Sequence, residues 1–133
     1  VATIDGVTWI NDSIATAPER ALAALAAFDE PLVLLAGGKD KDMVWDIWAD
    51  TVKSRVKQVV LFGTLAELLA KKLQGMDNLI QVNTLDEAVA AARETAATGD
   101  VVLLSPGGTS YDAYQDFAAR GEAFRALVRE MER

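Results

Sequence analysis

Residues 99–117 read GDVVLLSPGGTSYDAYQDF, and this segment indicates the fold class more clearly than any other. The four apolar residues 101–104 run without a polar break, which is typical of a strand buried on both faces of a parallel sheet. A loop of small, hydrogen-bonding residues follows at 105–110, and a helical pattern comes after it. A strand, a Gly/Ser/Thr loop and a helix in this order place free backbone N–H groups at the carboxyl end of a sheet, where an anion is held well.

The rest of the chain repeats the alternation of apolar runs and helical spacing. Strands are predicted at residues 7–10, 32–36, 58–62, 79–82 and 101–104, and helices at residues 17–27, 44–53, 65–74, 85–97 and 113–131. This order predicts an α/β fold, a Rossmann-like three-layer domain with a mainly parallel sheet. Asp5-Gly6 suits a tight turn, so residues 1–4 are expected to form an antiparallel edge strand on residues 7–10.

Local signals refine the expected helices. Thr-x-x-Glu occurs at residues 16–19, 64–67 and 84–87, and each occurrence predicts a capping box. Gly121 interrupts the last helix and predicts a kink or a close packing point. Trp45 and Trp48 lie at helical spacing, which favours packing on one face over a stacking platform for a ligand.

Composition narrows the function classes. The chain of 133 residues fits one domain, and its net charge of −7 argues against nucleic acid and anionic membrane surfaces as partners. The absence of cysteine and histidine excludes disulfides, thiol and imidazole catalysis and the usual zinc sites. A cytoplasmic setting is compatible with this cysteine usage, and Val1 suggests a piece of a longer protein.

The first of three notable loops follows residues 7–10. It carries Asn11, Asp12, Ser13 and Thr16. Asp12 could accept a hydrogen bond from a ribose hydroxyl, and Ser13 or Thr16 could donate to a carboxylate. The alternative is local capping, in which Asp and Ser form turns and Thr16 serves the following helix.

The second loop is Gly37-Gly38-Lys39-Asp40-Lys41. Glycines let the backbone approach a ligand, and a lysine supplies a point charge for phosphate or carboxylate. The spacing is not that of a P-loop, and an ordinary solvated turn stays open as the alternative. The third loop, residues 105–110, could likewise be a plain connection. The carboxyl ends of parallel strands share one side of a sheet, so the three loops are expected to converge.

Acidic residues near the second loop suggest a weaker alternative. Asp40, Asp42 and Asp46 could form a cation site. Their spacing does not fit an EF-hand, and an acidic helix start explains them through the helix dipole. No metal site is therefore predicted in this chain.

Together the three loops resemble the carboxy-terminal domain of the Mur ligases, and most closely the type that adds D-glutamate to UDP-N-acetylmuramoyl-L-alanine. The matching pieces are WINDSIAT at 9–16, LLAGGKDK at 34–41 and GDVVLLSPGGTSYDAYQDFAARGEAF at 99–124. The resemblance implies a cytoplasmic, monomeric ligase of peptidoglycan precursor synthesis, with UDP-sugar and ATP-binding domains upstream of this one. ATP and magnesium would be held mainly by the central domain, and this fragment alone would be inactive.

The resemblance also implies roles for individual residues. Asp12 matches the acidic residue near the nucleotide ribose. The positions that match contacts to D-glutamate are Thr16, Lys41, Ser110, Tyr111 and Phe117, the last two through the backbone. Asn11, Ser13 and Lys39 are weaker candidates, and no residue here is expected to be catalytic.

Two departures from the family pattern affect the amino-acid site. Ile14 stands where many relatives carry lysine, and Pro-Gly-Gly-Thr-Ser at 106–110 replaces the more usual Pro-Ala-Cys-Ala-Ser. Lys39 is expected to replace part of the missing charge.

Folylpolyglutamate synthetase-like ligases are a near relative in the same class. A free-standing Rossmann-like module that binds a nucleotide or anion, and a scaffold whose loops are only turns, are the readings from other classes.

Overall fold

The computed structural model describes residues 2–39, 43–108, 114 and 116–131. Strands and helices alternate along the chain, as predicted. The elements are β1 (Ala2–Ile4), β2 (Val7–Asn11), α1 (Pro18–Ala26), β3 (Leu32–Gly37), α2 (Asp46–Arg55), β4 (Gln58–Phe62), α3 (Ala66–Lys72), β5 (Leu79–Gln81), α4 (Leu85–Thr95), β6 (Val101–Gly107) and α5 (Phe117–Met131).

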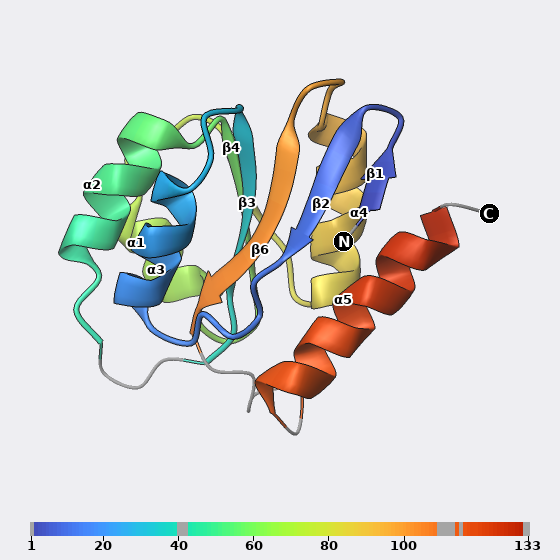
Figure 1. The fold of residues 1–133 in the computed structure, drawn as a ribbon. Coiled ribbons are helices and arrows are strands. Elements are labelled where there is room, and N and C mark those ends of the chain that lie inside the picture. The colour runs from blue at the N-terminus through green and yellow to red at the C-terminus, as the bar shows by residue number, and fades with distance from the viewer. Residues whose placement is uncertain (1, 40–42, 109–113, 115, 132–133) are drawn as a thin grey trace.

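The strands form a single six-stranded sheet in the order β1-β2-β6-β3-β4-β5 (Figure 1). Every neighbouring pair is parallel except β1 and β2, which pair antiparallel with Ile4 opposite Val7. The predicted edge hairpin is therefore confirmed. Asp5 and Gly6 turn the chain with positive φ angles of 53° and 79°, as a tight turn of this kind requires.

Helices cover both faces of the sheet. α1, α2 and α3 lie on one face, and α4 and α5 lie on the other (Figure 1). Alternate residues of β3 enter the two apolar cores: Leu34 packs in the core under α1–α3, and Val33 and Leu35 pack in the core under α4 and α5. A strand that buries both faces must be apolar throughout, which explains the unbroken runs in the sequence.

Two of the three predicted capping boxes are wrong. Only Thr84 caps its helix, through a reciprocal exchange with Glu87. α1 begins at Pro18, and its N-cap is Ala17, which makes no side-chain cap hydrogen bond. α3 has Leu65 as N-cap, also without a side-chain cap hydrogen bond, and the Thr64 hydroxyl donates instead to the carbonyl of Gly38, 3.2 Å away.

The predictions for tryptophan and Gly121 are confirmed. Trp45 and Trp48 are at most 1% exposed and pack edge to face, with ring centroids 5.2 Å apart. Gly121 is a close packing point, because a Cβ there would lie 3.0 Å from Nδ2 of Asn11. Asp46 opens α2, where an acidic side chain complements the helix dipole.

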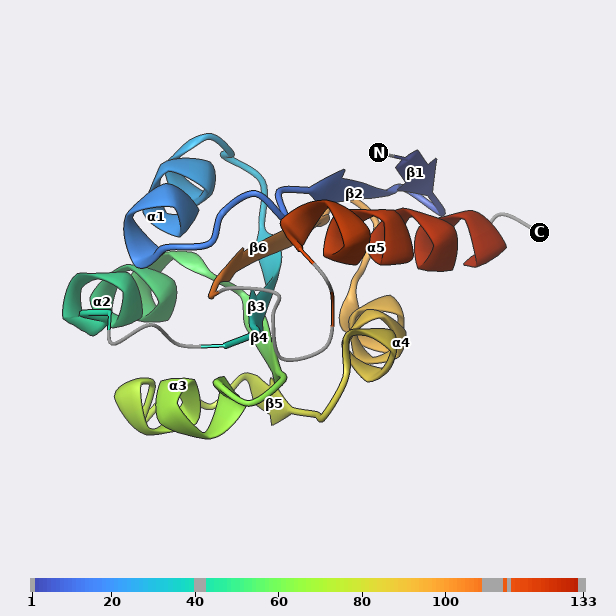
Figure 2. The same cartoon turned by 90° about the horizontal axis from the view of Figure 1, so that it is seen from below.

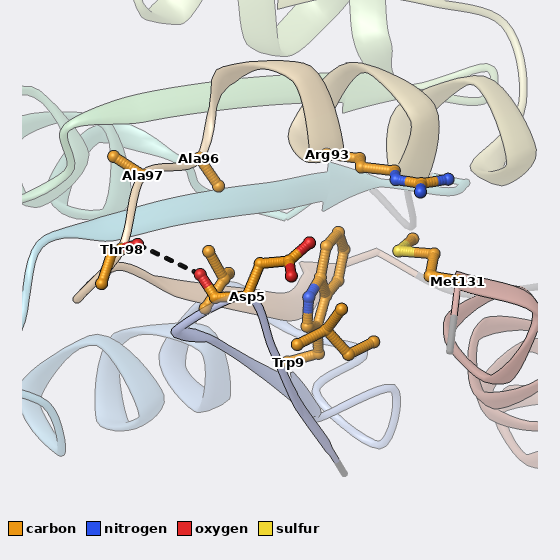
Figure 3. A pocket seen from close by; sticks show the side chains of 9 residues that line it. Asp5, Trp9, Arg93, Ala96, Ala97, Thr98 and Met131 are labelled. Carbon is orange, nitrogen blue, oxygen red and sulfur yellow. Dashed lines mark hydrogen bonds between the residues drawn. The ribbon is translucent and has the colours of Figure 1, made fainter. Parts of the chain in front are cut away.

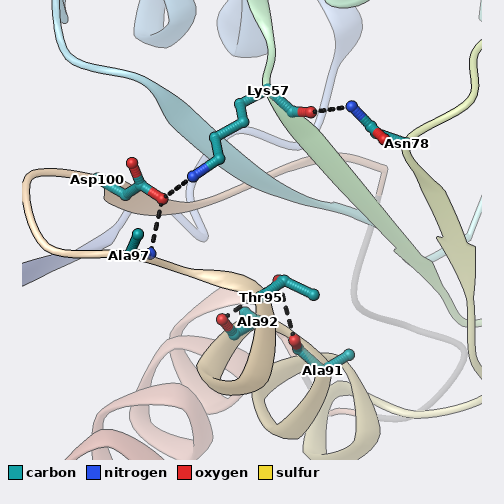
Figure 4. Close-up of polar contacts among 7 residues, drawn as sticks. All are labelled: Lys57, Asn78, Ala91, Ala92, Thr95, Ala97 and Asp100. Carbon is teal, nitrogen blue, oxygen red and sulfur yellow. Dashed lines mark hydrogen bonds and ion pairs between the residues drawn. The ribbon is translucent and has the colours of Figure 1, made fainter.

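An ion pair at the amino-terminal edge of the sheet holds the starts of β4 and β6 together. Lys57 Nζ lies 2.5 Å from Asp100 Oδ2, and the same oxygen accepts the backbone N–H of Ala97 at 2.8 Å (Figure 4). Asp100 is almost fully buried, so these two donors replace the water it loses on folding. This contact lies at the edge opposite the three candidate loops.

The strand order places those loops side by side. They follow β2, β6 and β3, which are three successive neighbours in the sheet. Figure 2 views the molecule from the carboxyl-terminal edge, where the connection from β2 to α1 passes beside the start of α5. The geometry needed for a shared site is thus set by the sheet itself.

Candidate functional site

The first and third loops are joined by backbone hydrogen bonds. The N–H of Asp12 donates to the carbonyl of Leu104 at 2.7 Å, and the N–H of Gly107 donates to the carbonyl of Ala15 at 2.8 Å. Between these two points the loop turns on itself, with the N–H of Ala15 donating to the carbonyl of Asp12 at 2.9 Å. The segment 12–15 is therefore fixed against the end of β6.

The second loop also meets the third. A Cβ on Gly108 would lie 2.6 Å from the carbonyl oxygen of Gly37 and 3.1 Å from that of Lys39. Only a residue without a side chain allows this approach without displacement. The carbonyl of Gly38 accepts the N–H of Leu65 at 2.9 Å, which ties the second loop to the start of α3. In the described part of the chain, all three loops thus converge.

Asp12 is held by a serine from the neighbouring strand. The hydroxyl of Ser105, which is fully buried in β6, donates to Asp12 Oδ2 at 2.9 Å. Burial raises the pKa of Asp12 above its usual 3.8, while the Ser105 hydrogen bond and the charge of Arg20 act in the opposite direction. The carboxylate keeps a second oxygen, Oδ1, which could accept a hydroxyl from a ligand.

Ser13 is occupied by contacts within the protein. It is 4% exposed, its hydroxyl donates to the carbonyl of Phe117 at 2.7 Å, and it accepts Nε of Arg120 at 3.0 Å. The one hydroxyl proton is therefore already donated and is not available for a ligand carboxylate. Asn11 likewise serves the loop, since its Oδ1 accepts the N–H of Ser13 at 3.1 Å.

An open groove runs between the first loop and the start of α5. Its volume is about 260 Å³, and Ile14 and Phe117 line it beside Asn11 and Ser13. Ile14 is 50% exposed and Phe117 is 43% exposed. Both apolar side chains therefore face solvent at the edge where the three loops meet.

The remaining predicted site residues fall into two groups. Thr16 is partly buried and follows Ala15, whose carbonyl is bonded to Gly107, and Lys39 is exposed at the end of β3. The other group lies outside the described residues and comprises Asp40, Lys41, Asp42, Ser110 and Tyr111. The ligand contacts expected of all these residues stay predictions.

Two residues that hold site side chains in place were not predicted from the sequence. Ser105 looked like the first residue of a loop, but it belongs to β6 and orients Asp12. Arg120 is 1% exposed and bonds to Ser13. A signal for Arg120 was present, because it falls at helical spacing among the apolar residues Phe117, Phe124 and Val128.

A separate cavity of about 310 Å³ lies beside the β1–β2 turn, away from the three loops. Asp5, Trp9, Arg93 and Met131 line it, and the hydroxyl of Thr98 donates to the carbonyl of Asp5 at its rim (Figure 3).

Among the described residues, no group of three or more His, Cys, Asp or Glu side chains could hold a metal ion. No helix in that part of the chain has the length and apolar character to cross a membrane.

The replacement Asp12→Asn is expected to leave the chain at least as stable as the wild type at pH 7. Because the folded pKa is raised, the folded chain binds the proton more tightly than the unfolded chain. The free energy of unfolding therefore falls as the pH rises through the interval between the unfolded and folded pKa values. The neutral asparagine avoids this cost, and its advantage should vanish below pH 3.8. Urea unfolding of both proteins across this pH range measures the difference, and a less stable variant at pH 7 would contradict it.

The chain is similar in sequence to a family of known proteins. Residues 1–108 match the model of the family described as "Mur ligase, glutamate ligase domain". The chain is 47% identical over 133 residues to the UDP-N-acetylmuramoylalanine--D-glutamate ligase of Roseiflexus sp. (strain RS-1), covering 96% of this chain and 28% of that protein. It is 45% identical over 131 residues to the enzyme of the same name from Desulfitobacterium hafniense (strain Y51), and this match covers 97% of this chain and 29% of that protein.

A solved structure extends the likeness to three dimensions. The MurF ligase from Thermotoga maritima, crystallised in complex with ADP, superposes with a TM-score of 0.60 at 19% identity, over 99% of this chain and 30% of that one. At this identity the likeness concerns the fold alone. The chain spans less than a third of the length of the curated relatives it matches.

Proposed function

We propose that this chain, which belongs to the Mur ligase family, forms the amino-acid-binding domain of an ATP-dependent ligase that adds D-glutamate to UDP-N-acetylmuramoyl-L-alanine. The whole enzyme would act in the cytoplasm in peptidoglycan precursor synthesis, as a monomer. The UDP-sugar and the phosphates of ATP would be held by domains outside this chain. Residues 1–133 would bind D-glutamate and complete the nucleotide pocket.

The reaction would pass through an acyl phosphate. ATP would phosphorylate the carboxylate of the UDP-sugar substrate, and the amine of D-glutamate would attack the acyl carbon through a tetrahedral intermediate, releasing ADP and phosphate. In this chain, Lys41, Thr16 and Ser110 would hold the two carboxylates of D-glutamate, and the backbone at Tyr111 and Phe117 would add contacts. A dianionic amino acid is well matched to a lysine, hydroxyl donors and a helix start.

Asp12 would accept a hydroxyl of the nucleotide ribose through its remaining oxygen. Magnesium, which neutralises phosphate charge when bound, would be held mainly by the central domain, as the family resemblance implies. The chain would therefore contribute binding and closure and no covalent step.

One observation carries the proposal: the loops after β2, β6 and β3 converge at one edge of the sheet. The 12–15 segment is bonded to the end of β6, and Gly108 of the third loop touches the backbone of Gly37 and Lys39. The described residues nearest to Lys41 and Ser110 in the sequence thus lie at the same edge as Asp12.

A substrate-profile assay of the full-length protein tests the proposal. With UDP-N-acetylmuramoyl-L-alanine and ATP, release of ADP is expected with D-glutamate and not with L-glutamate, L-alanine or a diamino acid. The 133-residue chain alone is expected to release no ADP under the same conditions. ADP release with a different amino acid would overturn the assigned specificity, and turnover by the isolated chain would overturn its assigned role as a binding domain.

A further inference from the structure

A buried arginine stands where α5 would otherwise present an apolar side chain. Arg120 is 1% exposed and lies among the buried residues of this helix, with Phe124 and Val128 in the following turns. Burial of a guanidinium is costly unless the group is well bonded, and a hydrophobic residue of similar volume often stabilises a core as well or better. The position of Arg120 therefore calls for a reason other than packing.

The contacts of Arg120 supply that reason. Its Nε donates to the hydroxyl of Ser13 at 3.0 Å, and its Nη2 donates to the carbonyl of the same residue at 2.9 Å. These two bonds come from one rigid guanidinium and fix both the side chain and the backbone of Ser13. Ser13 in turn donates to the carbonyl of Phe117 at 2.7 Å.

Asn11 and Gly121 form a second tie between the same two segments. Asn11 Oδ1 accepts the N–H of Ser13 at 3.1 Å, and its Nδ2 donates to the carbonyl of Gly121 at 3.4 Å. A Cβ on Gly121 would lie 3.0 Å from that nitrogen and 3.4 Å from the Cβ of Ser13, so the helix approaches the loop closely. The first turns of α5 and the loop after β2 are thereby joined as one unit.

We propose that Arg120 is a positioning residue that acts through Ser13 to hold both ligand-binding segments. On one side of Ser13 is Asp12, assigned to the nucleotide ribose, and on the other is Phe117, assigned to D-glutamate. This inference rests on the proposed function. It adds that one buried side chain governs the affinity for both ligands, although it touches neither.

The test is Arg120→Lys in the full-length ligase. Lysine keeps the charge but cannot make two directed bonds from one planar group. Small displacements of binding groups are costly, so the KM for ATP and the KM for D-glutamate are each expected to rise about 10-fold. The kcat is expected to stay within about twofold, because the lost interaction serves binding in the ground state and the transition state alike. Arg129→Lys, at an exposed position of the same helix, is the matched control and should change none of these values.

Hydrogen exchange provides a readout that does not depend on substrates. In Arg120→Lys, the amides of Ser13 and Ala15 should exchange at least about 10-fold faster, while those of β6 keep their protection. Ser13→Ala is a second variant, in case the first folds poorly. It removes the hydrogen bond from the Ser13 hydroxyl to the carbonyl of Phe117, and it should also raise both KM values.

The outcomes separate this inference from the proposed function. Unchanged KM values, a rise in only one of them, or faster exchange throughout the domain would each overturn the role of Arg120. If instead Asp12→Ala leaves the KM for ATP unchanged and Lys41→Ala leaves the KM for D-glutamate unchanged, the ligand assignments fail. The exchange rates of Ser13 and Ala15 would then still decide whether Arg120 holds the loop.

Discussion

Replacement of Gly37 by alanine is expected to destabilise the chain by about 3 kcal/mol, which is a large share of the total stability of a domain of this size. Gly37 ends β3 with a φ of +152° and pairs with Phe62 of β4. A Cβ at this position would lie 1.9 Å from the carbonyl oxygen of Phe62 and 2.8 Å from its carbonyl carbon. The obstruction is backbone within a sheet, so it cannot be relieved by a side-chain rotation, and the strands must separate.

Gly75→Ala is the matched control for this prediction. Gly75 also has a positive φ, +94°, but no atom lies within 4 Å of a Cβ built there. The control carries the backbone strain alone, about 1 kcal/mol. Urea unfolding of the wild type and both variants measures the two losses. Equal losses would show that the contact with Phe62 is relieved and that glycine is needed at residue 37 only for its backbone angle.

The second large effect is expected from Lys41→Ala in the full-length ligase. If Lys41 binds a carboxylate of D-glutamate, the lost charge-assisted hydrogen bond is worth about 1.5–3 kcal/mol, so the KM for D-glutamate should rise about 10- to 150-fold. The KM for ATP should change much less, because the nucleotide is assigned to Asp12. Initial rates at varied D-glutamate concentration, with ATP saturating, measure the effect.

Lys71→Ala is the control for charge. Lys71 is exposed on α3 and forms a long surface pair with Glu67, at 3.9 Å, so its removal changes the net charge equally without touching the site. A rise in the KM for D-glutamate in both variants would point to a general electrostatic effect of the acidic domain. A kinetically silent Lys41→Ala would remove this residue from the binding site.

Much of the fold could be predicted because each element carries its own signal. The apolar runs that became β3 and β6 are buried on both faces, and the Asp5-Gly6 turn identified the edge hairpin. The strand order was not predictable, because pairing of β6 with both β2 and β3 depends on contacts far apart in the sequence. The cap predicted at Thr64 failed for a similar reason: its hydroxyl donates to the carbonyl of Gly38, a contact that no local pattern encodes.

In the candidate site, too, one feature was predictable from the sequence and another depended on distant contacts. The convergence of three loops followed from a general property of parallel sheets and needed no knowledge of side-chain packing. The task of Ser13 could not be predicted, because a loop serine next to Asp12 suggests a ligand contact. Its partners, Phe117 and Arg120, come from the opposite end of the chain. An arginine at helical spacing among apolar residues is the pattern that indicates such a buried polar contact.

The position of β6 has a consequence for how the chain acquires its structure. Synthesis from the amino terminus produces β2 and β3 long before their common partner, so both strands must wait with unpaired backbone edges. The centre of the sheet is completed only when residues 101–107 insert between them. Insertion of β6 therefore completes the sheet. A nascent or truncated chain that ends before β6 would expose two unpaired strand edges, which can aggregate or bind chaperones.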